Sequence, residues 1–203
     1  LGVRLGRPRW LVAAVVAGLV VVLFSFGISL AWPGVRFDPT GLEGGPAGIA
    51  GVATALGLTV LVGVTGNALM AAGEEFGWRG YLLWELAPIG FWRASGIIGV
   101  AWGLWHLPGI VTGLQYESFP YVGIPVMLGA TVALSPLYTY LVWRADSVLA
   151  AVLLHGIFNG SSMTVHGFTA AEGLVVIYLH GTPSLDRTAV SRPVVDDPEG
   201  SLH

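Results

Sequence analysis

The stretch GEEFGWR at residues 73–79 is the most informative about the fold of this chain, because it places three charges inside an otherwise apolar run. Glu74 and Glu75 are adjacent, and Arg79 follows Glu75 by four residues. An ionised side chain in hydrocarbon costs at least about 2.5–3.5 kcal/mol, so such groups are rare in membrane segments and are usually paired or functional. The stretch therefore predicts a buried polar site in a helical membrane protein.

The composition of the whole chain supports this class. Its 203 residues are 54% hydrophobic and only 10% charged, whereas soluble domains carry about 25% charged residues. The apolar runs are continuous rather than alternating, which disfavours an outer-membrane barrel. The net charge of −3 comes without a basic block, so we expect no nucleic-acid partner. The predicted fold is all-α, a polytopic transmembrane helical bundle of about five to six spans in the plasma (inner) membrane.

Two residue types are absent from the sequence, and their absence narrows the chemistry. The chain has no cysteine, which excludes a cysteine nucleophile and a cysteine-ligated metal. All nine basic residues are arginine, so a serine–lysine dyad is excluded as well.

Apolar runs on both sides of the central stretch predict the spanning helices. They cover residues 10–31, 47–86, 94–114, 121–143 and 147–167, and a short piece at 173–179 fits a re-entrant, peripheral or tilted sixth helix. The run 47–86 exceeds the about 20 residues of one straight span, and Gly57, Gly63 and Gly66 are its candidate kink points. The segment 33–46 is typical of an external loop.

Charges at the ends of these runs predict the orientation. Arg4, Arg7 and Arg9 precede the first run, which predicts a cytoplasmic N-terminus. The apolar core of that run is longer than in a cleaved signal peptide, so we expect a retained helix. Residues 1–181 are expected to form one membrane domain, and residues 182–203 a polar, mobile tail.

The first polar cluster divides into a pair and a single carboxylate. Glu75 and Arg79 stand four residues apart, so they share a helix face and can form an ion pair. Glu74 points about 100° away from that pair and is left free, without a partner. It is therefore the better catalytic candidate, and Glu75 with Arg79 the better scaffold. The alternative is a single ion-pair network of all three residues.

Two later runs carry further polar residues at the same spacing. Trp102 and His106 are four apart, so the indole can pack on the imidazole, and Pro108 can open the helix beyond them. His155 and Asn159 are also four apart, and two donors on one face suit an oxyanion hole. The alternatives are a structural core histidine at 106 and hydrogen bonding between helices at 155 and 159.

Several weaker features are expected to be structural. Gly156 and Gly160 indicate close helix packing, and His166 and His180 are expected at an interface. Asp146 is expected to be a solvated loop charge.

The motifs that are absent disfavour several classes of intramembrane protease, and the motifs that are present resemble those of another family. The chain has no His-Glu-x-x-His, no Gly-x-Ser-Gly and no two aspartates within the runs. The order Glu-Glu-x-x-x-Arg, aromatic-x-x-x-His and His-x-x-x-Asn within residues 47–167 resembles the CPBP (CAAX protease and bacteriocin-processing, or Abi) family. That family includes the Rce1-type prenyl-protein proteases and usually has Phe where this chain has Trp102. The chain is shorter than the eight-span members.

The resemblance implies an intramembrane endopeptidase of the glutamate type. Glu74 would take a proton from water as general base, with His106 helping to hold that water. His155 and Asn159 would stabilise the oxyanion that forms on the peptide carbonyl. The implied partners are membrane lipids and a peptide or protein substrate.

The resemblance also implies supporting roles for two residues, and it leaves open whether the reaction uses a metal ion. Glu75 and Arg79 would orient the helix and tune Glu74. The family has been described as metalloproteases too, and Glu74, His106 and His155 could form a ligand set for zinc. Metal-free glutamate chemistry is favoured, and no cofactor is expected.

Two functions of other classes remain open from the sequence. A carboxylate with histidines inside the membrane could serve a proton-coupled transporter, although no internal repeat is visible. A non-catalytic immunity or scaffold protein is the other alternative.

Overall fold

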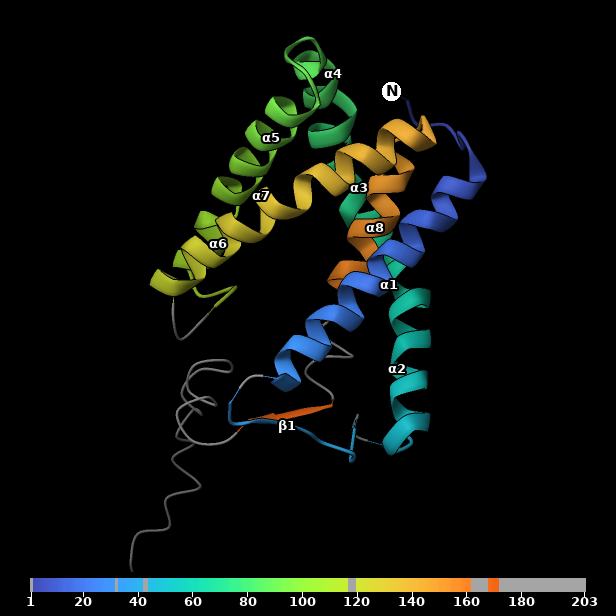
Figure 1. Cartoon of the computed structure of the whole chain (residues 1–203), viewed down its shortest axis with the longest axis vertical. Coiled ribbons are helices and arrows are strands. Elements are labelled where there is room, and N and C mark those ends of the chain that lie inside the picture. Colours follow the sequence, from blue (N-terminus) through green and yellow to red (C-terminus); the bar gives the residue numbers. More distant parts are fainter. Residues whose placement is uncertain (1, 32, 42–43, 117–119, 162–167, 172–203) are drawn as a thin grey trace, which may run out of the picture.

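The computed structural model describes residues 2–31, 33–41, 44–116, 120–161 and 168–171, and these are mainly helical (Figure 1). The elements are α1 (Pro8–Ala31), β1 (Val35–Phe37), α2 (Gly48–Gly63), α3 (Gly66–Glu75), the π-helix η1 (Phe76–Leu82), α4 (Leu83–Leu86), the 3₁₀ turn η2 (Ala87–Ile89), α5 (Phe91–Trp105), α6 (Leu107–Val111), α7 (Pro120–Ala145), α8 (Leu149–Asn159) and β2 (Thr169–Ala171). The all-α fold class is confirmed.

Three helical segments of the described chain are long and apolar enough to cross a membrane. They are α1, the α5–α6 segment Phe91–Val111, and α7. A fourth is added if the bent pair Gly48–Gly63 and Gly66–Ile89 counts as one span. The predicted count of five to six spans is therefore not confirmed. The apolar helices identify an integral membrane protein.

The long run 47–86 is broken between two of the three expected glycine positions. The helix axis bends by 49° between Gly63 and Gly66, whereas Gly57 lies within α2 and marks no break. A Cβ on Gly63 would meet the Ile157 backbone of α8 at 2.8 Å. The bend thus coincides with a close approach of α8, which leaves no room for a side chain.

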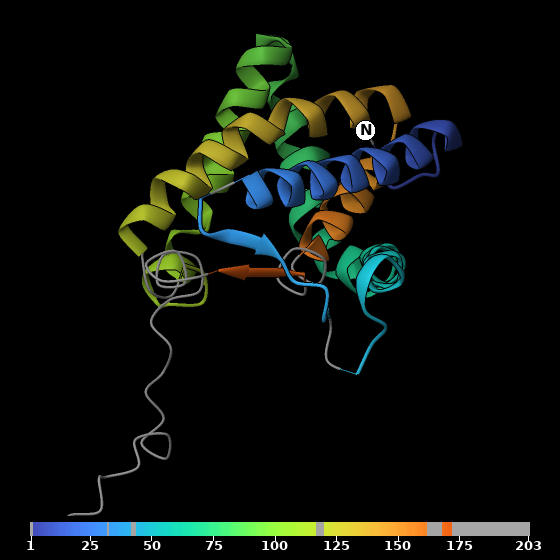
Figure 2. The same cartoon turned by 60° about the horizontal axis from the view of Figure 1, so that its bottom comes forward.

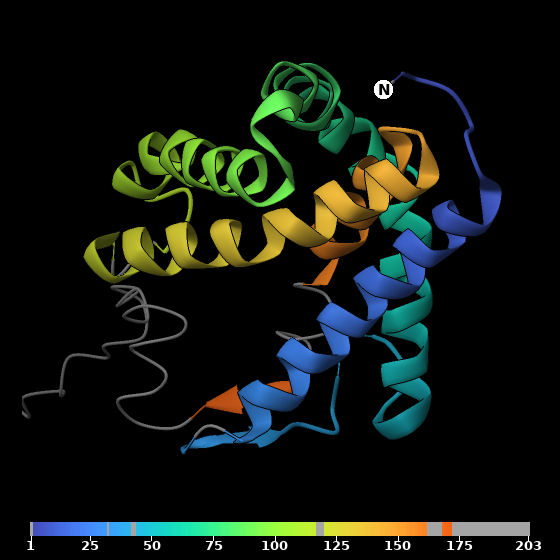
Figure 3. The ribbon, with the colours of Figure 1, turned by 45° about the horizontal axis from the view of Figure 1, so that its top comes forward.

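Helices α5 and α7 pack side by side along much of their length (Figure 3). Two glycines of α5 allow this approach, because a Cβ on Gly99 would lie 2.7 Å from the Val132 Cα and one on Gly103 3.0 Å from the Leu128 Cα. Helix α5 ends at Trp105, and Pro108 lies in the first turn of α6. The predicted opening of this helix near Pro108 is confirmed.

Helix α8 covers Leu149–Asn159, the first part of the predicted run 147–167, and residues 162–167 of that run lie outside the described residues. It packs against α1, α3 and the end of α2. A Cβ on Gly156 would lie 2.1 Å from the Gly63 carbonyl oxygen. The prediction that Gly156 marks close helix packing is confirmed, and this contact positions His155.

The expected loop 33–46 contains a short strand. β1 pairs antiparallel with β2, with Arg36 opposite Ala170, and the two strands lie below α1 in Figure 2. The rings of Phe37 and Phe168 stack with centroids 6.2 Å apart. The predictions for His166, His180, the piece 173–179 and the tail 182–203 fall outside the described residues, so the division near residue 181 stays a prediction.

Candidate active site

A fully buried carboxylate, Glu75, is the centre of the polar cluster. Arg79 Nη1 donates to its Oε1 and Oε2 at 2.9 and 3.1 Å, which confirms the predicted ion pair. His155 Nδ1 lies 2.8 Å from Glu75 Oε1. Neither Glu75 nor Arg79 is accessible to solvent, and His155 is 3% exposed. One carboxylate therefore joins the helix of residues 66–82 to α8.

The backbone changes its winding between the two members of the ion pair. Glu75 is the last residue of α3, and Arg79 lies within the π-helix η1. π-Helical turns are rare and often occur at functional sites. Arg79 still pairs with Glu75 across this turn, and the chain continues into α4.

The guanidinium of Arg79 lies between two aromatic rings. Its Cζ is 4.5 Å from the Trp102 ring centroid and 4.4 Å from that of Tyr138. Nε and Nη2 have no hydrogen-bond partner among the described residues, so the attraction to the two rings compensates part of their lost hydration. Arg79 is thereby held from α5 and α7 as well as by Glu75.

Glu74 is held by a contact that the sequence analysis did not predict. Trp102 Nε1 donates a hydrogen bond to Glu74 Oε2 at 2.9 Å. The prediction that Glu74 lacks a partner is therefore wrong, because the indole reaches across from α5. Glu74 forms no ion pair with Arg79 in the described structure, which disfavours the single-network alternative. It is half-buried, so its other oxygen, Oε1, remains open to water.

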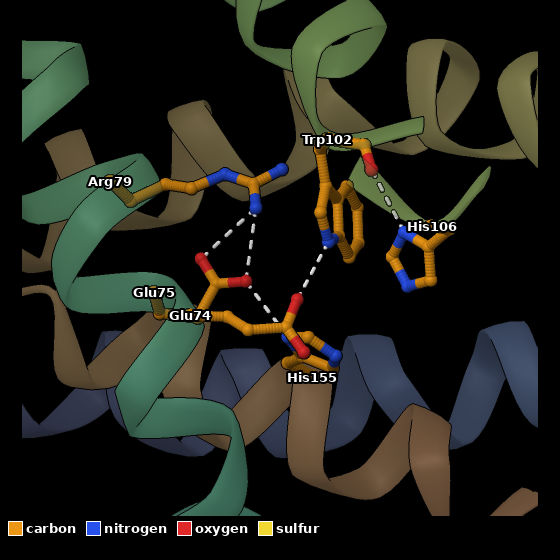
Figure 4. A network of polar contacts seen from close by, with 6 residues as sticks. All are labelled: Glu74, Glu75, Arg79, Trp102, His106 and His155. Atoms are coloured by element: carbon orange, nitrogen blue, oxygen red, sulfur yellow. Dashed lines mark hydrogen bonds and ion pairs between the residues drawn. The ribbon is translucent and has the colours of Figure 1, made fainter. Parts of the chain in front are cut away.

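His106 is also oriented by Trp102, from the backbone. Its Nδ1 lies 2.8 Å from the Trp102 carbonyl oxygen. A carbonyl can only accept, so Nδ1 carries the proton and the Nε2 of the neutral ring offers a lone pair. The two rings meet edge to face at 5.8 Å, as the spacing predicts. Figure 4 shows Glu74, His106 and His155 directed toward a common space.

His155 and Asn159 differ in their surroundings. The Nδ1 of His155 faces the Glu75 carboxylate, so Nε2 is its remaining polar atom. Its bond to Glu75 is also the interhelical hydrogen bond expected under the structural alternative. Asn159 is exposed at the end of α8, and its side chain makes no hydrogen bond to a described residue. The shared oxyanion contact of His155 and Asn159 stays a prediction.

The alternative metal site is not assembled in this arrangement. Within the described ranges, no three His, Asp or Glu side chains gather closely enough to hold a metal ion. Glu74, His106 and His155 face one another but do not form a ligand cluster, and the two Nδ1 atoms are engaged elsewhere. We therefore derive no step through a metal.

Tyr138 is a residue of the site that sequence reasoning missed. It is 1% exposed and touches Arg79, Trp102 and His155, with ring centroids 5.4 and 6.1 Å from those of Trp102 and His155. A tyrosine in an apolar run is usually a core or interface residue. Only the packing of α7 on α5 and α8 brings it to the cluster.

Comparison with known proteins gives the chain its family. The family model described as "Type II CAAX prenyl endopeptidase Rce1-like" matches residues 54–161, which is more than half of the 203 residues. The chain is also similar to a protein named CAAX prenyl protease 2 from Methanococcus maripaludis. The two are 32% identical over 98 residues, which cover 45% of this chain and 36% of the relative. The match thus spans little more than a third of the relative.

No solved structure matches the chain. The matched range holds all three motifs, from the glutamate pair on α3 to His155 and Asn159 on α8. Because the family model covers these elements together, the chain belongs to the Rce1-like family of type II CAAX prenyl endopeptidases.

Proposed function

We propose that this protein is an intramembrane endopeptidase that hydrolyses peptide bonds with a water activated by Glu74. The observation that carries the proposal is the half-buried Glu74 carboxylate, held at one oxygen by Trp102 and facing the rings of His106 and His155 (Figure 4). Membership in an endopeptidase family supports a hydrolase over a transporter. A protein or peptide in the membrane is the proposed substrate.

Water activation is the first step. The indole engages Glu74 Oε2, so Oε1 takes the proton from water. Neither imidazole makes a direct hydrogen bond or ion pair with Glu74 in the described structure, and the proposed water lies among the three side chains. The lone pair of His106 Nε2 accepts a hydrogen bond from the remaining O–H of the water, which stays intact, and so aims the oxygen at the carbonyl carbon.

Stabilisation of the oxyanion is assigned to His155 and Asn159. Nδ1 of His155 donates to Glu75, so Nε2 can donate to an oxyanion only when the ring is an imidazolium. The Asn159 amide is the second proposed donor. Collapse of the tetrahedral intermediate then passes the proton from Glu74 to the leaving amine.

The decisive test replaces the proposed base. Membranes that contain the wild-type protein or Glu74→Gln are profiled for released peptides. General base catalysis contributes about 10²–10⁴-fold, so the variant should lose at least about 100-fold in cleavage rate while its unfolding temperature in detergent is retained. Glu85→Gln, an exposed carboxylate on α4, is the matched control and should cleave normally.

Cleavage by Glu74→Gln at the wild-type rate would reject the mechanism, and a cellular phenotype that survives this substitution would favour a non-catalytic protein. Metal dependence is tested separately. Activity after chelation is compared with elemental analysis of the purified protein, and activity that survives complete metal removal supports metal-free chemistry.

A further inference from the structure

A cavity lies apart from the polar cluster, where α4, η2, α5 and α7 meet. Its volume is about 410 Å³, within the about 300–1,000 Å³ typical of ligand pockets. It is almost wholly apolar. The residues that line it are Leu83, Trp84, Ala87, Gly90, Phe91, Ala94, Thr139 and Trp143. None of these is a motif residue of the proposed hydrolase.

One polar side chain in this cavity has no partner within the protein. Thr139 is 3% exposed, and its hydroxyl makes no hydrogen bond within the described part of the chain. Threonines in helices commonly bond the carbonyl four residues earlier, as Thr131 does here with Met127. A buried hydroxyl without a partner carries a desolvation cost. Thr139 lines the cavity, so a rotation of its side chain would bring the hydroxyl, now out of contact with solvent, to a polar atom of a molecule there.

The cavity reaches the beginning of α5, where an anion is favoured. Gly90 caps this helix and supplies no side-chain hydrogen bond. The first amides of a helix have no intrahelical partners, and the helix dipole adds a partial positive charge there. Arg93 lies in this first turn, is exposed, and forms no ion pair with a described residue. Phe91, two residues earlier, lines the cavity.

The same end of the molecule carries an excess of positive charge. Helix α7 ends beside the cavity at Ala145, and the backbone amide of Arg7 donates to the Ala145 carbonyl at 2.8 Å. Arg144 adds a charge, held 4.6 Å above the Trp10 ring. Asp146 is paired with Arg4, so Glu85 is the nearby carboxylate left without an ion pair among the described residues. Such a surface attracts anionic lipid headgroups, and each arginine raises the affinity for them about fivefold.

We propose that this cavity binds one anionic phospholipid. Its phosphate lies at the amino end of α5 beside Arg93, and an acyl chain fills the apolar cavity between α5 and α7. An ester oxygen of the lipid accepts a hydrogen bond from Thr139. A spanning α5 begins at a membrane surface. The phosphate therefore lies at the level of the lipid headgroups, and the acyl chain extends toward the middle of the membrane. The proposal does not depend on catalysis.

The test measures lipid retained by the whole 203-residue chain. Wild-type protein in nanodiscs of phosphatidylcholine with or without phosphatidylglycerol is extracted into mild detergent, and bound lipid is counted by native mass spectrometry. The wild-type protein should retain one phosphatidylglycerol and no equivalent phosphatidylcholine. Arg93→Gln should weaken retention about fivefold through loss of one charge. Ala87→Phe, which fills the cavity from an exposed position, should abolish retention.

Two controls separate this site from the general lipid shell and from the active site. Arg9→Gln removes an exposed arginine from the beginning of α1, and Glu74→Gln removes the proposed base. Both should retain the lipid as the wild type does. Equal retention of the two lipids, normal retention by Ala87→Phe, or equal losses in Arg93→Gln and Arg9→Gln would each overturn the proposal.

Discussion

At the scale of single residues, Trp102 connects the parts of the site. Its indole N–H holds Glu74, its carbonyl orients His106, and its ring covers Arg79. Phenylalanine, usual at this position in the family, can supply the ring contact and the carbonyl but no donor. We infer that this chain adds a hydrogen bond that restrains the proposed base.

Replacing the donor while keeping the ring tests this role. Trp102→Phe should lower kcat by about tenfold, because a hydrogen bond to a charged group contributes about 1.5–3 kcal/mol. KM should stay within about twofold, since substrate contacts are kept. Steady-state kinetics on a cleaved peptide gives both values. Trp92→Phe, at an exposed position of the same helix, should change neither, and a loss confined to KM would contradict the assignment.

The buried ion pair predicts a strong asymmetry between single and double substitutions. Glu75→Gln leaves the Arg79 charge buried between two rings and should cost about 3–5 kcal/mol of stability. Glu75→Gln combined with Arg79→Met removes both charges and should recover much of that loss. Thermal unfolding in detergent measures both variants. A double variant less stable than Glu75→Gln would show that Arg79 stabilises the fold without its carboxylate.

At the scale of elements, glycines determine how closely helices approach the site. Gly99→Ala should destabilise the protein by about 1–3 kcal/mol, because its Cβ would meet the Val132 backbone at 2.7 Å. Gly96, on the same helix, has no atom within 4 Å of the added Cβ, so Gly96→Ala should be neutral or stabilising by about 0.5–1 kcal/mol. Unfolding temperatures in detergent compare the two, and equal effects would contradict the packing of α5 on α7.

At the scale of the whole molecule, the N-terminal segment is tied to the loop after α7. Arg4 pairs with Asp146, and the Ser147 hydroxyl donates to the Arg4 carbonyl. The hydrogen bond from Arg4 is the main cause of a lowered pKa at Asp146, below its ordinary 3.8. A lowered folded-state pKa stabilises the folded form above the unfolded value, and this contribution is lost as the pH falls through the folded pKa.

The pH dependence of this tie can be followed directly. The chain has no cysteine, so Leu5→Cys provides a unique site for a spin label. Label mobility should stay low from about pH 7 to about pH 4 and rise below that range. Adding Asp146→Asn should give high mobility at every pH, and asparagine tolerates the positive φ of 56° at this position. If the dependence of label mobility on pH were unchanged in that variant, the backbone contacts alone would hold the N-terminal segment to the loop after α7.

The sequence by itself determined the membrane class, the Glu75–Arg79 pair and the helix carrying each motif, because these follow from composition and from spacing within one helix. Gly63 and Gly66, which border the observed break, were two of its three candidate kink points, and it indicated the helix opening at Pro108. Only the tertiary structure decided that Trp102 holds Glu74, that His155 bonds Glu75 and that Tyr138 covers Arg79. These contacts join different helices, and periodicity within a segment carries no information about which faces meet.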